Sequence, residues 1–275
     1  MVRQYLDPAD HLPVLLIKPH TKGKLVYLRK YLPALNKILR SKVPDSPRYY
    51  VDFFSGPGKC IDRHGKICDG SPLIAIKTNP PFTNFIFVDI NENYCNALKR
   101  RLEGIPNVDV KKGDCNEVVS EVLSMMNTYD PCFVFLDPFG LELKWKTIEK
   151  LSRKRRIDIL INFPVGAIHR SIGTKGAEHT VTECLGGDEW RNVRGRGYPA
   201  RIRLRDLYTT KMQKFFEHIS PKLVYNQNNV PLYYLIYGCH FDVGKKIWED
   251  ITKPIKQQSL ESIFGDSANE WIYIE

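Results

Sequence analysis

From residue 49 to residue 162 the chain alternates short β-rich runs with stretches of helical periodicity. The β-rich runs are Tyr49–Phe53, Phe85–Val88, Val108–Lys111, Phe133–Leu136 and Ile157–Asn162. The helical stretches between them are Glu92–Leu102, Asn116–Met126 and Trp145–Arg153. A helix between two strands carries the chain back across the sheet, so the next strand runs parallel to the previous one. The alternation therefore predicts an α/β fold with a mostly parallel sheet covered by helices.

The last part of the chain breaks this alternation. Lys222–Tyr225 and Leu232–Tyr237 are both β-rich, and only residues 226–231 separate them. A connection this short permits a hairpin but leaves no room for a crossover helix. We therefore expect the sheet to end in an antiparallel hairpin.

Two regions lie outside this core, and both are basic. Residues 18–42 have the pattern of an amphipathic helix with eight Lys or Arg and no acid. Residues 170–206 are an insertion before a helix expected at about residues 206–218, and the stretch 191–205 holds six arginines and no acid. The expected organisation is a basic helical segment (1–48), an α/β core (49–240, with the insertion at about 170–206) and a C-terminal extension packed on the core (241–275).

The formal net charge of the 275-residue chain is +10. A basic balance of this size favours an anionic partner, and nucleic acid is the commonest one. The candidate contacts to phosphates are Arg194, Arg196, Arg201 and Arg203, with Tyr198 among them. A solvated basic surface without such a partner is the alternative, and the sequence leaves both open.

Neither a targeting segment nor a membrane span is visible in the hydropathy pattern. The apolar run near the start, Val14–Ile17, is far shorter than the roughly 20 residues that cross a bilayer. We expect a cytoplasmic protein. The seven cysteines are scattered, several of them in apolar runs, which predicts reduced and buried thiols. Cys60 and Cys68 flank His64, but without a second ligand pair we expect no metal site.

The first β-rich run leads directly into Asp52-Phe53-Phe54-Ser55-Gly56-Pro57-Gly58. Glycines at these places allow a tight turn and a close approach of the backbone to a ligand at the carboxyl end of the strand. A dinucleotide fingerprint needs a third glycine three residues further on, and that position is Ile61. The motif therefore counts against NAD and favours S-adenosyl-L-methionine (SAM). The candidate binding residues here are Asp52, Phe54, Gly56 and Gly58.

Two more acids follow the next two β-rich runs. Asp89 can accept hydrogen bonds from both hydroxyls of a ribose, and Asp114 can accept one from the adenine amino group. A single aspartate at the end of a strand more often caps the helix that follows. Because Asp52, Asp89 and Asp114 end three successive strands, we include all three in the candidate cofactor site.

The fourth β-rich run ends in Asp137-Pro138-Phe139-Gly140, the most specific motif in the chain. The carboxylate of Asp137 and the carbonyl of Pro138 can accept hydrogen bonds from an exocyclic NH2 group, which aligns its nitrogen toward the methyl group of SAM. Phe139 can stack on the ring that carries the amine. These three residues are the candidate catalytic residues. The alternative is a proline turn with Phe139 packed inside.

These motifs resemble those of known families. The pattern D-x-F-x-G-x-G together with Asp-Pro-aromatic is similar to amino-methyltransferases that act on DNA and RNA, and the form D-P-F-G resembles the tRNA N2-guanosine dimethyltransferases. More closely, residues 18 to 240 resemble the three-Cys-motif partner family of bacteria and archaea. The shared pieces are His20-Thr21-x2-Lys24 with Tyr31-Leu32, Tyr50-Val51-Asp52 to Gly58, Gly70-Ser71-Pro72-Leu73-Ile74-Ala75, Gly113-Asp114, Leu136–Gly140 and Ile161-Asn162-Phe163-Pro164.

The resemblance implies a Rossmann-like, SAM-dependent methyltransferase fold, because that family is described as methyltransferase-like. The family is named for a neighbouring radical-SAM-like protein with three clustered cysteines. This chain has no C-x3-C-x2-C cluster and would be the partner. One departure is the 37-residue spacing from Asp52 to Asp89, where about 20 residues often suffice. The excess lies in Cys60–Pro72, which we expect to be a polar loop, either a lid or an extended turn.

The favoured function is a SAM-dependent N-methyltransferase that acts on an exocyclic amine of a nucleobase in RNA or DNA. The alternative from another class is a SAM- or nucleoside-binding partner subunit of a radical-SAM-like protein, without catalysis of its own. Methylation of a small metabolite or of a protein fits the core motifs but leaves the basic segments unexplained.

Overall fold

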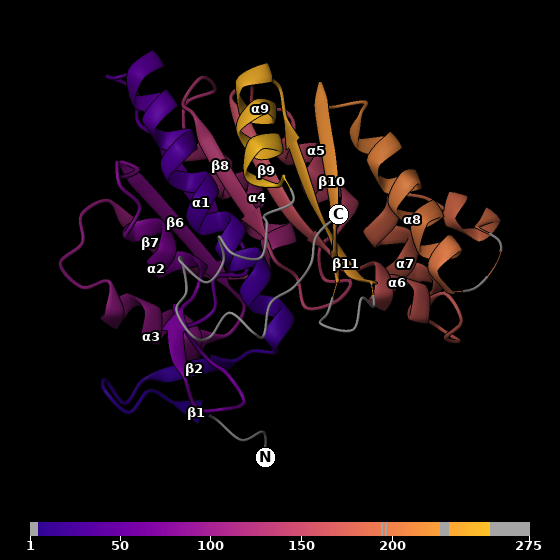
Figure 1. The fold of residues 1–275 in the computed structure, drawn as a ribbon, viewed down its shortest axis with the longest axis horizontal. Coiled ribbons are helices and arrows are strands. Elements are labelled where there is room, and N and C mark those ends of the chain that lie inside the picture. Colours follow the sequence, from indigo (N-terminus) through magenta and orange to yellow (C-terminus); the bar gives the residue numbers. More distant parts are fainter. Residues whose placement is uncertain (1–4, 194, 196, 226–230, 254–275) are drawn as a thin grey trace. The chain divides into compact units, whose positions relative to one another are not determined.

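The computed structural model describes residues 5–193, 195, 197–225 and 231–253 (Figure 1). The chain divides into two compact units, Met1–Phe135 and Leu136–Glu275. The larger sheet has seven strands in the order β10-β11-β9-β8-β3-β6-β7, and a smaller sheet has four strands in the order β1-β2-β4-β5. Among the helices of the described residues, none combines the length and the apolar character that crossing a membrane requires.

The first unit contains the smaller sheet and a group of parallel strands. Its elements are β1 Tyr5–Leu6, β2 Pro13–Leu16, α1 Pro19–Lys42, β3 Tyr49–Asp52, β4 Lys59–Ile61, β5 Ile67–Asp69, α2 Ser71–Ile76, β6 Asn84–Asp89, α3 Glu92–Arg101, β7 Val108–Lys112, α4 Cys115–Ser124 and β8 Cys132–Leu136, whose last residue begins the second unit. Strand β3 pairs in parallel with β6 and with β8, and β6 pairs in parallel with β7. The sequence predicted these four strands and this orientation, and the structure confirms them.

The second unit contains the antiparallel end of the larger sheet. Its elements are α5 Trp145–Leu151, β9 Ile157–Phe163, α6 Val165–Ser171, α7 Glu178–Leu185, the 3-10 helix η1 Glu189–Asn192, α8 Gly197–Met212, β10 His218–Tyr225, β11 Pro231–Cys239 and α9 Asp242–Ile251. Strand β11 runs antiparallel to both β9 and β10, which confirms the predicted hairpin. Residues 226–230 of its turn, and residues 254–275 of the predicted C-terminal extension, lie outside the described residues.

The core of the first unit forms around the aromatic residues of β3 and its neighbours. Tyr50 is fully buried, and its ring stacks on Phe133 of β8 with 5.8 Å between the centroids. Every residue of β8 is buried. A continuous apolar run of this kind is typical of a parallel strand that is covered on both faces. Tyr31 of α1 packs against the same Phe133 at 5.4 Å, so α1 places its apolar side on this sheet.

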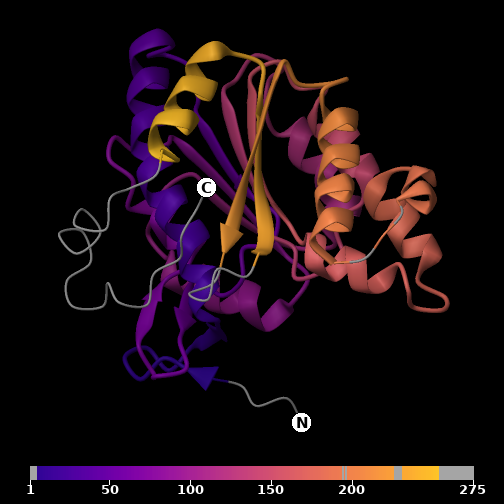
Figure 2. The same cartoon turned by 45° about the vertical axis from the view of Figure 1, so that its right-hand side comes forward.

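The hairpin in the second unit is covered on both faces by helices (Figure 2). A side chain added at Gly238 of β11 would lie 3.3 Å from the Met212 side chain of α8. The hydroxyl of the neighbouring residue, Tyr237, would contact a side chain added at Gly244 of α9. Because successive residues of a strand point to opposite faces, α8 covers one face of β11 and α9 covers the other.

Helix α8 corrects one prediction. The sequence predicted a helix at about residues 206–218, but α8 spans Gly197–Met212, and β10 begins at His218. Ala200, Leu204, Tyr208 and Met212 follow one another at four-residue intervals, and all of them are buried. This apolar stripe begins inside the arginine-rich stretch, because arginine is a good helix former and can occupy the other face.

The segment Cys60–Pro72 corrects a second prediction. It forms the hairpin of β4 and β5 and the start of α2, and is therefore regular secondary structure where the sequence predicted a polar loop. The carboxylate of Asp62 organises the hairpin turn by accepting the N–H groups of His64 and Lys66, each over 2.9 Å. Its other oxygen accepts from Lys22 of α1 over 2.7 Å.

These contacts make the stability of the first unit depend on the charge of Asp62. Burial alone would raise the pKa of Asp62, but the bonds from Lys22, Lys66 and His64 lower it to about 2. A lowered pKa contributes stability that is present above the unfolded value near 3.8 and is lost as the pH falls through about 2. We expect Asp62→Asn to reduce the free energy of unfolding by about 1–2 kcal/mol at pH 6. Urea unfolding should show this difference narrowing below pH 4.

The matched control is Glu92→Gln, which removes an ion pair between Glu92 and Lys112, two exposed side chains. This variant should unfold like the parent at pH 6. If the Asp62→Asn difference were unchanged down to pH 2.5, the charge of Asp62 would not be its source.

Candidate functional site

The glycine motif forms a turn that contacts the acid at the end of β6. Gly56 and Gly58 have φ angles of +58° and +87°, in the left-handed region that favours glycine. The N–H of Gly56 donates to Oδ2 of Asp89 over 2.8 Å, and the N–H of Asn91 donates to Oδ1 over 2.8 Å. Burial raises the pKa of Asp89, and these two bonds oppose the shift. Two of the predicted cofactor-binding residues, Gly56 and Asp89, therefore lie in direct contact.

Asp52 lies beneath this turn. Its side chain is fully buried at the end of β3. One carboxylate oxygen accepts the N–H of Phe54 over 3.1 Å, and the other accepts the hydroxyl of Tyr50 over 3.4 Å. Asp52 thus fixes the start of the glycine turn, and Phe54 is half-buried above it. Direct contact of Asp52 or Phe54 with a cofactor stays a prediction.

The two remaining strand-end acids have different local roles. Asp114 is the N-cap of α4, and its Oδ1 accepts the N–H of Asn116 over 2.8 Å. The helix-capping alternative is therefore right for Asp114, whose contact with adenine stays a prediction. For Asp89 the same alternative is wrong, because Asn91 is the N-cap of α3.

An ion-pair network that the sequence analysis missed holds the glycine turn from outside. Arg101 of α3 donates to the carbonyl of Pro57 over 2.6 Å and to both carboxylate oxygens of Asp10 over 2.9 Å. Lys59, directly after the turn, donates to Asp7 over 2.6 Å and to Asp10 over 3.0 Å. The hydrogen bond from Arg101 holds the pKa of Asp10 well below its ordinary value. The segment before β2 is therefore bound to the turn by charge.

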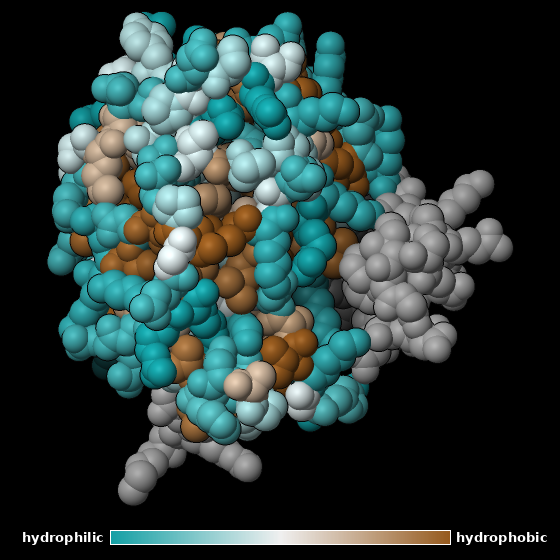
Figure 3. Space-filling view, turned by 90° about the vertical axis from the view of Figure 1, so that its left-hand side faces the viewer, coloured by the Kyte–Doolittle hydropathy of each residue, from teal (hydrophilic) through white to brown (hydrophobic). Residues whose placement is uncertain are grey.

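Two side chains beside the turn also escaped the sequence analysis. Ser55 is 5% exposed, and its hydroxyl has no hydrogen-bond partner among the described residues. Ile90, directly after Asp89, is 71% exposed and is among the large hydrophobic residues that the first unit leaves in solvent. Figure 3 shows that hydrophobic side chains gather on one face of the molecule among hydrophilic ones. A buried polar atom without a partner is typical of a site that a ligand completes.

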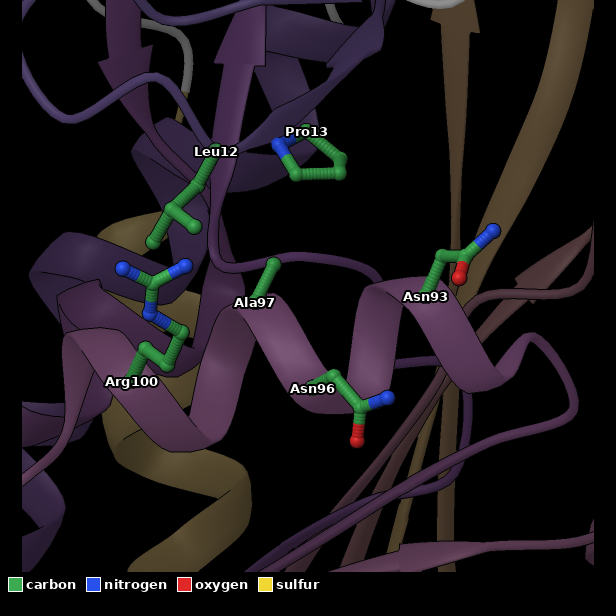
Figure 4. A pocket seen from close by; sticks show the side chains of 6 residues that line it. All are labelled: Leu12, Pro13, Asn93, Asn96, Ala97 and Arg100. Atoms are coloured by element: carbon green, nitrogen blue, oxygen red, sulfur yellow. The ribbon is translucent and has the colours of Figure 1, made fainter.

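A cavity of about 240 Å³ lies between α3 and the start of β2 (Figure 4). Asn93, Asn96, Ala97 and Arg100 of α3 line it, together with Leu12 and Pro13. None of the predicted site residues lines this cavity. The predicted cofactor-binding residues therefore do not form this cavity.

The motif Asp137–Gly140 begins the second unit with an exposed aromatic ring. Phe139 is 74% exposed, so the alternative in which Phe139 packs inside is wrong. Pro138 before it is buried, and the N–H of Gly140 after it donates to Oε2 of Glu142 over 2.6 Å. The residues before and after Phe139 are thus fixed in place, and its ring lies in solvent.

Asn162, at the end of β9, is the partner of Asp137. Its Nδ2 donates to Oδ1 of Asp137 over 2.7 Å. The side chain is 8% exposed, and its Oδ1 has no hydrogen-bond partner among the described residues. In the sequence, Asn162-Phe163-Pro164 stands out only as part of the family resemblance. The structure places Asn162 in contact with a predicted catalytic residue.

The arginine-rich stretch is exposed only in part. Arg194 and Arg196 lie outside the described residues. Arg201 is half-buried and donates to the carbonyl of Pro231 over 3.1 Å, whereas Arg203 is exposed. Arg205 lies over the ring of Tyr234 at 5.1 Å. Of the two predicted phosphate contacts among the described residues, Arg203 is therefore more exposed than Arg201.

No protein-family model and no curated protein sequence matches this chain. The resemblance to the three-Cys-motif partner family therefore stays a prediction.

Similar solved structures exist, all at low sequence identity. One is a Legionella pneumophila protein of family DUF519, with a TM-score of 0.54, 12% identity, and coverage of 91% of this chain and 96% of that chain. Another is an O-methyltransferase from Bacillus cereus in complex with S-adenosylhomocysteine, with a TM-score of 0.47, 13% identity, and coverage of 84% and 86%. A third is Trm1 from Pyrococcus horikoshii with S-adenosyl-L-methionine, with a TM-score of 0.39, 16% identity, and coverage of 89% and 61%.

Identities this low show the fold alone. The observed strand order, the parallel strands and the antiparallel hairpin confirm the predicted fold class, an α/β Rossmann-like methyltransferase fold.

Two glycine substitutions can separate the cost of positive φ from the cost of steric crowding by Leu98. An added Cβ at Gly58 would lie 2.8 Å from Cδ1 of Leu98, which is fully buried. We expect Gly58→Ala to cost about 2–4 kcal/mol of stability, since positive φ and overpacking both oppose it. Gly65 has a similar φ of +81°, with nothing within 4 Å of an added Cβ. Gly65→Ala should cost only the conformational part, about 1–2 kcal/mol. Equal costs in thermal or urea unfolding would mean that Leu98 does not crowd this position.

Proposed function

We propose that this chain is a SAM-dependent methyltransferase whose first unit binds the cofactor. The observation that carries this proposal is the contact between the Gly56 N–H and the carboxylate of Asp89. It joins a side-chain-free turn to an acid at the carboxyl end of the neighbouring strand, which is where open α/β sheets bind their ligands.

The residues present fit this cofactor. Gly56 and Gly58 leave the turn without side chains, and the Ser55 hydroxyl lies buried without a partner among the described residues. Asp89 would accept from ribose hydroxyls, and the exposed side chain of Ile90 would cover an apolar ring face. When bound, SAM supplies a methyl group on a positively charged sulfur.

The first functional prediction concerns Asp89. We expect the parent to bind S-adenosylhomocysteine and not to bind NAD. Asp89→Ala should weaken that binding by about 1–3 kcal/mol, because the ribose hydroxyls lose their acceptor. Calorimetry with both ligands measures these affinities. Asp109→Ala is the matched control, because Asp109 is also a strand aspartate of the first unit but lies outside the proposed site. Equal affinity of the parent and Asp89→Ala would contradict the assignment.

For the substrate we propose an exocyclic amine of a nucleobase in RNA or DNA. Such a nitrogen is a poor nucleophile because its lone pair is delocalised into the ring. Hydrogen bonds from its two N–H groups to Asp137 and to the Pro138 carbonyl would turn the lone pair out of that conjugation. Positive charge develops on the nitrogen during transfer, and the carboxylate of Asp137 stabilises it. Phe139, which is 74% exposed, offers its ring face to a base.

Asn162 supports this role of Asp137. Its Nδ2–H group donates a hydrogen bond to Asp137 and is too weak an acid to protonate the carboxylate. Asp137 therefore keeps its negative charge, and the bond fixes the position of one of its oxygens. The Oδ1 of Asn162, which has no partner in the described part of the chain, adds another acceptor beside it. A site with several acceptors in one place suits a group with several N–H donors.

We also propose a nucleic acid as the macromolecular partner. The net charge of +10 supports this, as do the exposed Lys37, Arg40 and Lys42 at the end of α1 and the exposed Arg203 on α8. These side chains would contact phosphates and contribute a salt-dependent affinity. A base in a duplex would have to be flipped out to reach Phe139. Arg194, Arg196 and Arg201 remain part of this proposal, and the cytoplasmic location remains a prediction from the sequence.

The test of the proposed chemistry is Asp137→Asn. This variant keeps the shape and can still accept from Asn162, but it loses the charge that stabilises the transition state. We expect transfer from labelled SAM to whole-cell RNA or DNA to fall at least 100-fold, about 2.7 kcal/mol, with cofactor affinity within a few-fold of the parent. Phe139→Ala should instead raise KM, by a factor that corresponds to about 1–3 kcal/mol of binding free energy if the ring stacks on a base.

Glu142→Gln is the control. Glu142 lies in the same loop, and the amide oxygen of the variant can still accept the hydrogen bond from the Gly140 N–H. Parent-level turnover by Asp137→Asn would refute the mechanism. Cofactor binding by the parent without transfer to any nucleic acid, metabolite or protein would favour the alternative, a non-catalytic partner subunit of a radical-SAM-like protein.

A further inference from the structure

Two cysteines face each other across the β4–β5 hairpin. Cys60 and Cys68 are register partners in this antiparallel pair, and both are in the reduced thiol form. Hydrogen bonds lie two residues away on either side, from Gly70 N–H to Gly58 O over 2.8 Å and from Asp62 N–H to Lys66 O over 3.1 Å. The cysteines therefore occupy a hydrogen-bonded position of the ladder, where Cα atoms lie about 5.5 Å apart. Disulfides have the same spacing.

The two thiols already contact each other and differ in access. A hydrogen bond joins the side chains of Cys60 and Cys68. Cys60 is 6% exposed, whereas Cys68 is half-buried. A reagent in solution can therefore reach Cys68 first, and Cys60 lies behind it.

The surroundings of Cys68 favour its thiolate. The hydrogen bond from Cys60 lowers the pKa of Cys68; burial opposes this shift, Lys22 adds to it, and Asp62 and Asp69 oppose it. Burial instead raises the pKa of the thiols of Cys95, Cys184 and Cys239. Because the thiolate is the nucleophile, Cys68 is the better nucleophile of these four.

The hairpin that carries the pair is anchored to other elements. Asp62 pairs with Lys22 of α1 at 2.7 Å, and Asp69 pairs with Lys77 at 2.8 Å. An added Cβ at Gly70 would lie 3.0 Å from the carbonyl oxygen of Gly58 and 3.5 Å from Sγ of Cys60. A link between the two sulfurs would thus close the hairpin at the place where it leaves the glycine turn. No group of three His, Cys, Asp or Glu side chains in the described part of the chain is placed to hold a metal ion here instead.

We propose that Cys60 and Cys68 are a reversible dithiol–disulfide site, oxidised by exchange with a small disulfide of the glutathione type.

The exchange has two steps. The thiolate of Cys68 attacks one sulfur of oxidised glutathione; a bond forms between them, the glutathione S–S bond breaks, and one glutathione leaves as a thiolate that takes up a proton. The thiol of Cys60 then loses its proton, and its sulfur attacks the sulfur of Cys68. The Cys60–Cys68 bond forms and the second glutathione leaves. Two protein thiols are oxidised, and one glutathione disulfide is reduced to two thiols.

The test uses the full chain incubated with oxidised glutathione, quenched in acid, unfolded and alkylated. We expect the intact mass before alkylation to fall by two hydrogen atoms, and five of the seven thiols to react with the alkylating reagent. Peptide mapping of the parent should find Cys60 joined to Cys68, and dithiothreitol should restore all seven thiols.

Cys68→Ser and Cys60→Ser should each abolish the link, whereas the matched control Cys115→Ser, a buried cysteine of the same unit, should form it like the parent. Three results would overturn the proposal: seven reactive thiols in the treated parent, a glutathione adduct that persists on Cys68, or a link that maps to another pair. Because the map is made on the parent, the proposal stays testable even if a variant folds poorly.

Discussion

The guanidinium of Arg101 is the group on which the candidate cofactor site most depends. Its side chain is 4% exposed, and it donates to both oxygens of Asp10 and to the carbonyls of Leu12, Pro13 and Pro57. These five bonds use all five of its N–H groups. A buried cation is stable only when it is paired in this way. One residue of α3 therefore joins the segment before β2 to the glycine turn.

The turn itself is held from three directions. Arg101 binds the Pro57 carbonyl, Asp89 accepts the Gly56 N–H, and Gly70 donates to the Gly58 carbonyl. Glycine loses more conformational freedom on folding than other residues, so two glycines in one fixed turn need such contacts to offset the loss. Because these bonds are made within the first unit alone, the turn is formed before any ligand binds. Binding then requires little reorganisation, which is the general advantage of a preorganised site.

The sequence predicted what local periodicity determines and missed what depends on distant pairs. The strand ends Asp52, Asp89 and Asp137 follow from apolar runs, because a polar residue after a buried strand must lie at the sheet edge. The start of α8 was placed too late, since arginine obscured a buried stripe that begins at Ala200. Asn162 lies 25 residues from Asp137 in sequence, and no local pattern indicates such a contact.

The second unit leaves the aromatic ring of Phe139 in solvent instead of burying it. A phenylalanine left in water forgoes about 1.5–3 kcal/mol of burial, so an unconstrained chain would turn this ring inward. The residues around the ring are fixed: Pro138 is buried, Gly140 is bonded to Glu142, and Asp137 is bonded to Asn162. Each of them fixes the backbone or the residue beside the ring and leaves the ring itself exposed. The hydrophobic free energy that the fold does not use at Phe139 is therefore available to a planar group that stacks on it, beside the carboxylate of Asp137.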